Sequence, residues 1–356
     1  MITRKKTKLT KKMRKRQIIV RTTSAIVLAL FCVVGGGILL FKGKEDGGDP
    51  KYIPPETQVK SLVPVTMELQ EEKEQLQEAP WSYEAHRTEK TQGFADNIIS
   101  KSGILIEVES GNILAEKGAF DRMNPASMTK ILTVLVAAEL LEEQQLEESF
   151  VMTQEIKDYS YLHDCSDTGF EVGEVIPVRD LFYGTILPSG ADAALGLATF
   201  TAGSQEAFVE KMNRKLEEMG LSETTHVMNC VGLYDENHYS TPYDMAVIIK
   251  AATDNPWCRE VLSTHCYTTT PTAEHSEGII ISNWFLRRIE DKDTHGEVLC
   301  AKTGYVKESG SCAASLALDY NQKEYICVTA GSTSSWQCIF DQVNLYTKYL
   351  PIREKE

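Results

Sequence analysis

The order of strand-like and helix-like segments restricts what this chain can fold into more than any other feature of its sequence. Residues 102–118, SGILIEVESGNILAEKG, predict two strands joined by a tight Ser-Gly-Asn turn. Three further strand-like runs, at 296–306, 311–320 and 324–332, come near the end of the chain, and helical patterns lie between the two groups. We therefore expect one antiparallel sheet made from both ends of a folded region, with a helical region inserted between its strands.

Four segments carry the helical pattern. Residues 127–143 are apolar around most of the helix circumference, which predicts a buried helix. Residues 205–220 and 241–253 predict amphipathic helices, and residues 336–350 predict a last helix after the final strand. Lys130 interrupts the apolar surface of the first helix, where a solvated lysine does not fit well.

The beginning of the chain differs from the rest in composition. Residues 1–21 contain ten Lys or Arg and no acid, and residues 22–41 contain no charged side chain. Because about 20 apolar residues in a helix cross a bilayer, we expect a basic cytoplasmic tail followed by a single-pass membrane anchor. The alternative is a cleaved signal segment, for which Gly35, Gly36 and Gly37 offer small residues. Either way, we expect the rest of the chain to be extracytoplasmic.

Residues 42–93 are rich in glycine, proline and charge, and we interpret them as a stalk between the bilayer and a folded domain at 94–350, with 351–356 as a tail. Beyond residue 21 the chain carries 27 basic and 51 acidic residues, a net charge of −24. Such an acidic body argues against nucleic acid as a partner, since phosphate contacts need basic surface.

Cysteine and histidine give little support for a metal site. Eight of the nine cysteines lie beyond the apolar run, which permits up to four disulfides but equally permits free thiols. Neither C-x-x-C nor H-E-x-x-H spacing occurs, so we expect neither a bound metal nor a cofactor.

The segment NPASMTKILT, residues 124–133, is the first that predicts chemistry. Ser127 falls at the start of the buried helix, and Lys130, three residues further on, lies on the same face. Burial near another cation would lower the pKa of this lysine, and the neutral amine could then take the proton of the serine hydroxyl. The alternative is a capping serine beside an ordinary lysine.

Two later segments add polar groups of the same kind. LPSGADAALGLA, residues 187–198, predicts a turn into a small-residue helix with Ser189 at the turn. CAKTGYV, residues 300–306, lies in a predicted strand, where alternation places Lys302 and Gly304 on one face of the sheet. A glycine in such a strand lets a ligand approach the backbone closely.

In the order S-x-x-K, S-G-x, K-T-G, these segments resemble the serine-type penicillin-binding enzymes and β-lactamases, and most of all the D-alanyl-D-alanine carboxypeptidases. The resemblance extends from about Phe94 to Leu350. It implies a three-layer α/β/α sandwich, class α+β, in which helices flank a five-stranded antiparallel sheet with an inserted all-helical region. Some relatives carry a further C-terminal domain and membrane-binding tail; because this chain ends at Glu356, we expect its N-terminal segment to provide the anchoring.

The resemblance also implies catalytic roles. Ser127 would be the acylated nucleophile and Lys130 its general base. Ser189 would relay protons between the nucleophile and the leaving amine. The substrate would be the D-Ala-D-Ala end of a peptidoglycan stem peptide, and β-lactams would inhibit by acylating the same serine.

Substrate binding would fall to the K-T-G strand. Lys302 would keep the site electropositive, and Thr303 would bind the terminal carboxylate of the substrate. Gly304 would let the substrate lie against the strand. The backbone N–H groups of Ser127 and Tyr305 would form the oxyanion hole.

One departure from the family pattern concerns the second motif, which is usually Ser-x-Asn. Here Ala191 stands in the third position, so the amide that would orient the lysine and bind the substrate is missing. Losing one or two such hydrogen bonds costs about 10- to 100-fold in rate, and the nucleophile remains. A literal Ser-Gly-Asn at Ser110–Asn112 precedes the nucleophile and has a sufficient explanation as a hairpin turn.

We therefore expect a serine-type D-Ala-D-Ala carboxypeptidase that also binds penicillin. One alternative is a β-lactamase, although neither a Ser-Asp-Asn triplet nor a separate glutamate motif of the class A enzymes is found. The other is a catalytically weakened homologue that binds the cell wall or regulates its synthesis, in which Ala191 marks decay of the site.

Overall fold

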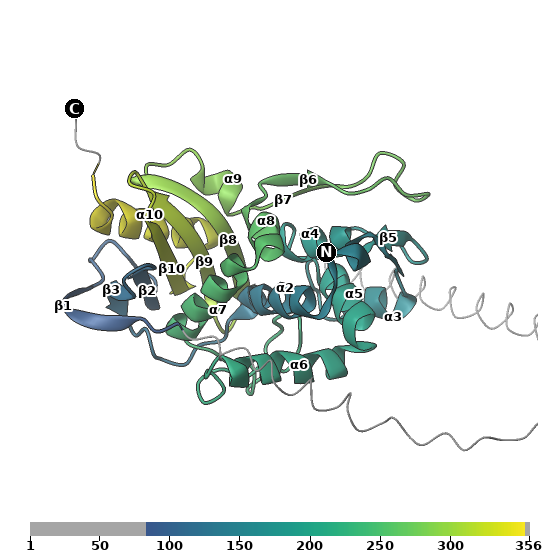
Figure 1. Cartoon of the computed structure of the whole chain (residues 1–356), viewed down its shortest axis with the longest axis horizontal. Helices are drawn as coiled ribbons and strands as arrows, with labels where there is room; N and C mark the ends of the chain where they lie inside the picture. Colours follow the sequence, from purple (N-terminus) through teal and green to yellow (C-terminus); the bar gives the residue numbers. More distant parts are fainter. Residues whose placement is uncertain (1–82, 353–356) are drawn as a thin grey trace, which may run out of the picture. The chain divides into compact units, whose positions relative to one another are not determined.

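The strands from the two ends of the chain meet in the middle of one sheet (Figure 1). The computed structural model describes residues 83–352. In this part of the chain the main sheet has six strands in the order β1-β3-β2-β10-β9-β8, and every neighbouring pair is antiparallel except β1 with β3. The strands are β1 (His86–Gly93), β2 (Ser102–Glu107), β3 (Asn112–Lys117), β8 (Gly296–Val306), β9 (Gly310–Asp319) and β10 (Glu324–Ser332).

The sheet has one strand more than the expected five. Strand β1 runs parallel to β3 at the edge of the sheet, with an irregular register between Arg87 and Gln92. Its sequence, HRTEKTQG, is polar and largely exposed, so it lacks the apolar alternation by which the other strands are found. The backbone of the edge strand β3 supplies its partners instead, and residues 86–93 therefore belong to the folded region rather than to the predicted stalk.

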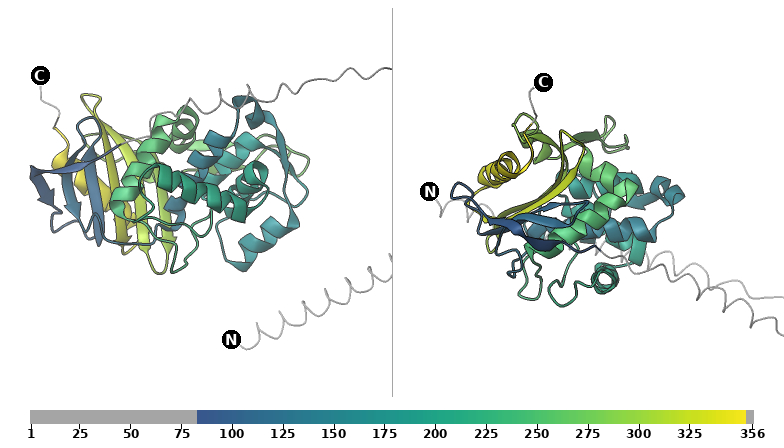
Figure 2. Two further views of the ribbon diagram at one scale, coloured as in Figure 1. Left: turned by 60° about the horizontal axis from the view of Figure 1, so that its bottom comes forward. Right: turned by 60° about the vertical axis from the view of Figure 1, so that its left-hand side comes forward.

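Alternate residues of the strands enter two cores on opposite faces of the sheet. In β2, Ile104 and Ile106 pack in one cluster of buried residues, while Leu105 between them packs in the other. Helix α10 (Ser335–Tyr349) covers the second face together with the short helix α9 (Leu286–Ile289), and α7 (Pro242–Asp254) covers the first. The expected three layers are therefore present, and Figure 2 shows the sheet between its helices.

The inserted helical region lies between β3 and β8 in sequence and beyond β8 in space (Figure 1). The buried helix predicted at 127–143 starts with a 3-10 turn at Ala126–Met128 and continues as α2 (Thr129–Leu140). The other helices of this region are α3 (Gln154–Leu162), α4 (Val178–Ile186), α5 (Ala191–Ala202), α6 (Gln205–Glu218) and α8 (Pro256–Ser263), with a 3-10 turn at Glu143–Glu147. Two small two-stranded sheets pair β4 (Ser149–Val151) with β5 (Val175–Pro177), and β6 (Cys266–Thr268) with β7 (Ile280–Ser282).

The eight cysteines of the described part, 83–352, are free thiols, and most of them are buried. In the same residues no helix combines the length and apolar character needed to cross a bilayer. The basic tail at 1–21, the apolar segment at 22–41 and most of the stalk at 42–93 lie outside the described residues.

Candidate active site

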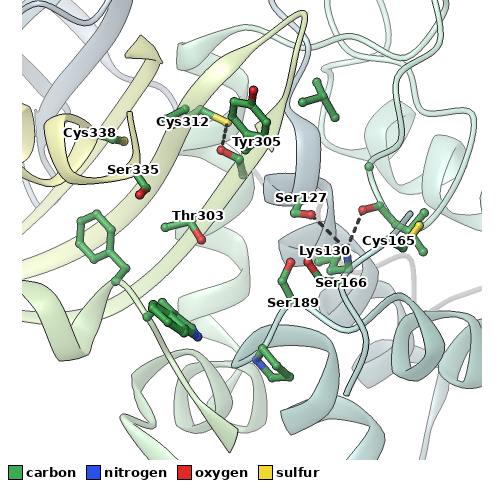
Figure 3. Close-up of a pocket in the computed structure, with 18 of the residues that line it drawn as sticks. Ser127, Lys130, Cys165, Ser166, Ser189, Thr303, Tyr305, Cys312, Ser335 and Cys338 are labelled. Carbon is green, nitrogen blue, oxygen red and sulfur yellow. Dashed lines mark hydrogen bonds between the residues drawn. The ribbon is translucent and has the colours of Figure 1, made fainter. Parts of the chain in front are cut away.

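A cavity of about 650 Å³ lies between the edge strand β8 and the inserted helical region (Figure 3). All three sequence motifs contribute side chains that line this cavity, and Lys302 lies directly behind its wall, against Ser189. Ser127, Lys130 and Ser189 line the cavity from the helical side, and Thr303 and Tyr305 line it from the strand.

The turn that carries Ser127 is held in a conformation that most residues avoid. Ala126, directly before Ser127, has φ of 48°, in the left-handed region. Two glycines allow the neighbouring backbone to pack against this turn. A Cβ on Gly232 would lie 2.0 Å from the carbonyl oxygen of Ala126, and a Cβ on Gly304 would lie 2.9 Å from that of Pro125. The glycine of K-T-G is therefore needed for the strand to approach the turn that carries Ser127.

Within residues 83–352, the hydroxyl of Ser127 accepts a hydrogen bond from the buried side chain of Lys130. Its Nζ donates to Ser127 Oγ at 3.1 Å and to the carbonyl oxygen of Val231 at 2.7 Å. The side chain is 2% exposed, and this burial lowers the pKa of Lys130 to about 8. About a tenth of the amine is thus neutral near pH 7, within hydrogen-bond reach of the serine.

The second serine is bonded to the second lysine. Lys302 Nζ donates to Ser189 Oγ at 2.9 Å and to the carbonyl oxygen of Thr303 at 2.9 Å. Burial holds the pKa of Lys302 well below its usual range, and the charge of Lys130 lowers it further. Ser189 itself has φ of 64°, which is a second left-handed residue at the site.

The K-T-G strand keeps its ordinary alternation at the site. Lys302 reaches Ser189, and the side-chain direction of Gly304 points at the turn that carries Ser127, so both lie on the face toward the helices. Thr303 and the exposed Tyr305 lie on the alternate positions and line the outer part of the cavity (Figure 3). Their positions agree with the predicted strand.

Ala191 occupies the first residue of α5 and is 1% exposed. It brings no amide group to Lys130, but its backbone N–H donates to the carbonyl oxygen of Ser166 at 2.8 Å. The neighbouring Asp192 accepts from the backbone N–H of Thr168 at 2.8 Å and pairs with Lys157 at 3.5 Å. The start of α5 therefore holds the loop between α3 and β5 against the cavity.

Several residues of the cavity lie outside the three motifs from which the site was predicted. The loop from His163 to Ser166, the segment Val231–Leu233 and the residues Trp284 and Arg288 all line it. They belong to no short motif, and only tertiary packing brings them together. The Ser-Gly-Asn at Ser110–Asn112, by contrast, forms the hairpin turn between β2 and β3, with Gly111 at φ of 68°.

The fold and the paired serine–lysine contacts define a class of proteins, those of the DD-peptidase fold with a serine–lysine site. The chain belongs to the D-alanyl-D-alanine carboxypeptidase family, whose sequence profile matches residues 87–334. This confirms the resemblance inferred from the three motifs.

Individual relatives agree with this placement. The carboxypeptidase DacF of Bacillus subtilis is 30% identical over 236 residues, which cover 66% of this chain and 58% of DacF. DacA of Escherichia coli K12 is 36% identical over 165 residues, covering 43% of this chain and 39% of DacA. This chain thus matches less than two thirds of the length of either relative.

Among solved structures, the Streptomyces K15 DD-transpeptidase has a similar fold, with a TM-score of 0.63 and 27% sequence identity. The superposition covers 71% of this chain and 97% of the transpeptidase.

Proposed function

We propose that this protein is a serine-type D-Ala-D-Ala carboxypeptidase that removes the terminal D-alanine from peptidoglycan stem peptides. The observation that carries the proposal is the hydrogen bond from the buried amine of Lys130 to Ser127 Oγ, in a site where Lys302 holds a second serine. Family membership supports the same reaction.

The first half of the reaction forms an acyl-enzyme. Neutral Lys130 accepts the hydroxyl proton of Ser127, and Oγ attacks the carbonyl carbon between the two D-alanines. The backbone N–H groups of Ser127 and Tyr305 stabilise the oxyanion, and one such donor typically contributes about 100- to 1000-fold in rate. Ser189 passes the proton from Lys130 to the amine of the departing D-alanine as the peptide bond breaks.

The second half returns the free enzyme. Water attacks the ester carbonyl, Lys130 accepts the proton of the water, and the bond to Ser127 Oγ breaks with return of a proton to that oxygen. Lys302 keeps Ser189 in place through both halves of the reaction by donating to its Oγ. A β-lactam acylates Ser127 in the same way, but its leaving nitrogen stays attached to the acyl group.

The test measures D-alanine release from a diacylated Lys-D-Ala-D-Ala peptide by the full-length protein in detergent. Ser127→Ala is expected to reduce release at least about 1000-fold and to abolish covalent labelling by fluorescent penicillin. Ser110→Ala is the matched control, since it removes the serine of the other Ser-Gly-Asn sequence at a hairpin turn, and it should leave both activities unchanged.

Two outcomes would overturn the assignment. Rapid turnover of a chromogenic β-lactam without D-alanine release would identify a β-lactamase. Binding of the peptide with neither release nor penicillin labelling would identify a non-catalytic homologue in which Ala191 marks decay of the site.

A further inference from the structure

His238 is a buried histidine that the proposed reaction does not use. It lies in the segment between α6 and α7 and is 1% exposed. Both ring nitrogens have partners: Nδ1 lies 3.2 Å from the backbone nitrogen of Met228, and Nε2 lies 2.8 Å from Thr129 Oγ1. Because the N–H of Met228 can only donate, Nδ1 accepts and carries no proton. The neutral ring therefore has its proton on Nε2.

The Nε2–H group of His238 begins a chain of hydrogen bonds that ends in the turn that carries Ser127. Thr129 Oγ1 donates its one proton to the carbonyl oxygen of Ala126 at 2.7 Å, so it accepts from Nε2. The backbone of His238 reaches the same alanine from the other side. Its carbonyl oxygen accepts from Asn124 Nδ2 at 2.8 Å, and Asn124 Oδ1 accepts from the N–H of Ala126 at 2.9 Å. His238 is therefore linked to both peptide groups that flank Ala126.

This double attachment acts on a residue with a left-handed backbone, since φ of Ala126 is 48°. A residue other than glycine keeps that conformation only where its surroundings hold it. In the trans peptide between Ala126 and Ser127, the C=O and N–H bonds point in opposite directions. The bond from Thr129 to the carbonyl therefore also sets the direction of the Ser127 N–H, one of the two donors of the proposed oxyanion hole.

The surroundings of His238 keep its ring in the neutral form that this arrangement needs. Burial, together with the nearby His226, lowers the pKa of His238 to about 4, although Asp235 opposes the shift. A second proton would have to lie on Nδ1, facing the N–H of Met228. The neutral ring, with its Nε2–H donor, is therefore present in nearly every molecule above about pH 6.

We propose that His238 is a positioning residue that orients the Ser127 N–H toward the oxyanion, acting through Thr129 and the carbonyl group of Ala126. The role rests on the proposed function, because the oxyanion forms only when Ser127 attacks a carbonyl group. A donor that is turned away loses much of its effect on the transition state but little of its effect on substrate binding. Loss of the His238 ring should therefore lower kcat and the rate of penicillin acylation, with little change in KM.

Two substitutions separate the donor to Thr129 from the rest of the His238 ring. The side-chain amide of glutamine extends about as far as Nε2 and can donate to Thr129, whereas that of asparagine extends only as far as Nδ1. In the full-length enzyme in detergent, His238→Asn is expected to lower kcat for release of D-alanine from a diacylated Lys-D-Ala-D-Ala peptide about 10- to 100-fold, with KM changed less than about threefold. His238→Gln should recover at least about threefold of this loss.

His226→Gln is the matched control. The ring of this neighbouring histidine contacts the backbone carbonyl of Asn237 instead of Thr129. Its replacement should change kcat by less than about twofold.

A second experiment measures acylation by fluorescent penicillin, which does not depend on D-alanine release. Thr129→Val removes the hydroxyl at nearly equal volume and should slow acylation about as much as His238→Asn. Because both residues act through one chain of hydrogen bonds, the double variant should be no slower than the slower single variant. In each variant the rate should still rise with pH as in the wild type, since Lys130 keeps its burial and its bond to Ser127.

An unchanged kcat in His238→Asn, equal losses in the asparagine and glutamine variants, or additive losses at positions 129 and 238 would overturn the role of His238 in an otherwise active enzyme. A loss that follows the fraction of unfolded protein, measured by thermal unfolding, would overturn it as well. If the wild-type protein neither releases D-alanine nor is acylated, the proposed function fails, and the role of His238 fails with it.

Discussion

At Lys130, burial and the surrounding charges act on one amine in opposite directions. Burial lowers its pKa to about 8, and the carboxylate of Asp192 counteracts part of this effect. About one-tenth of the Lys130 side chains are therefore neutral at pH 7, and the neutral amine can accept a proton directly. A lysine exposed to water, with its ordinary pKa, would be almost fully charged at pH 7.

The rate of Ser127 acylation should therefore rise with pH. Below pH 8 the fraction of neutral Lys130 increases about tenfold per pH unit, and above pH 8 it levels off. Stopped-flow labelling with fluorescent penicillin between pH 6 and pH 9 measures this dependence. A rate that stays constant or falls between pH 6 and pH 8 would contradict the role of Lys130 as base.

Ala191→Asn is expected to raise D-alanine release about tenfold. The asparagine amide would add the hydrogen bonds to the lysine and substrate that the alanine side chain lacks, and each contributes on the order of 1 kcal/mol. Ala191→Val is the matched control for side-chain volume, and it should not increase the rate. An unchanged rate in Ala191→Asn would refute the hydrogen-bond argument.

The sequence permitted prediction of the residues that carry short-range patterns. Helix spacing pairs Ser127 with Lys130, whereas the contact between Ser189 and Lys302, 113 positions apart, was expected only from the family resemblance. Arg288 has no such pattern, and its place at the cavity depends on aromatic contacts with α10, which starts 47 positions later in the chain at Ser335. Contacts between distant segments of this kind need the folded structure.

At the scale of elements, the site depends on how closely β8 approaches the turn that carries Ser127. A Cβ on Gly304 would lie 2.8 Å from Cys312 Sγ and 3.0 Å from the backbone nitrogen of Ser127. The neighbouring backbone cannot move away without displacing the serine. Strand β8 and the turn that carries Ser127 are therefore packed directly against each other, although the K-T-G and S-x-x-K motifs lie far apart in sequence.

Gly304→Ala should accordingly slow penicillin labelling of Ser127 at least about tenfold and destabilise the fold by about 1–3 kcal/mol. Labelling kinetics and thermal unfolding measure the two effects. Gly93→Ala is the control, because a Cβ there meets no atom within 4 Å, and it should change neither quantity. Normal labelling in Gly304→Ala would show that the close approach is not required.

The elements themselves were predictable where apolar residues alternate or repeat. The β2–β3 hairpin, the three late strands and the last helix all have this pattern, and the structure confirms them. The pattern does not predict strand β1, because its polar residues show no such alternation. Its place in the sheet comes from backbone pairing with β3, which depends on the edge of a sheet already formed.

At the scale of the whole molecule, we propose that residues 1–41 anchor an exported domain. The full-length chain should remain with the membrane fraction after a high-salt wash, because apolar residues 22–41 carry no charge that salt could screen. Removal of residues 1–41 should release the penicillin-labelled domain into the soluble fraction. An N-terminal sequence beginning near Gly37 in the mature protein would instead identify a cleaved signal segment.

The central position of β10 in the sheet determines at what point during its synthesis the protein can become active. Strand β10 pairs with β2 on one side and β9 on the other, so Tyr325 lies beside Glu107, which was synthesised more than two hundred residues earlier. Long-range pairing of this kind forms slowly, and the two halves of the sheet cannot join until the last strand has left the ribosome. A growing chain that lacks β10 therefore already carries Ser127, Lys130 and Lys302, but β8 and β9 are not yet joined to the rest of the sheet. Reactivity toward penicillin should therefore appear only once the chain is complete. The time at which covalent labelling begins would then measure when the final step of folding takes place.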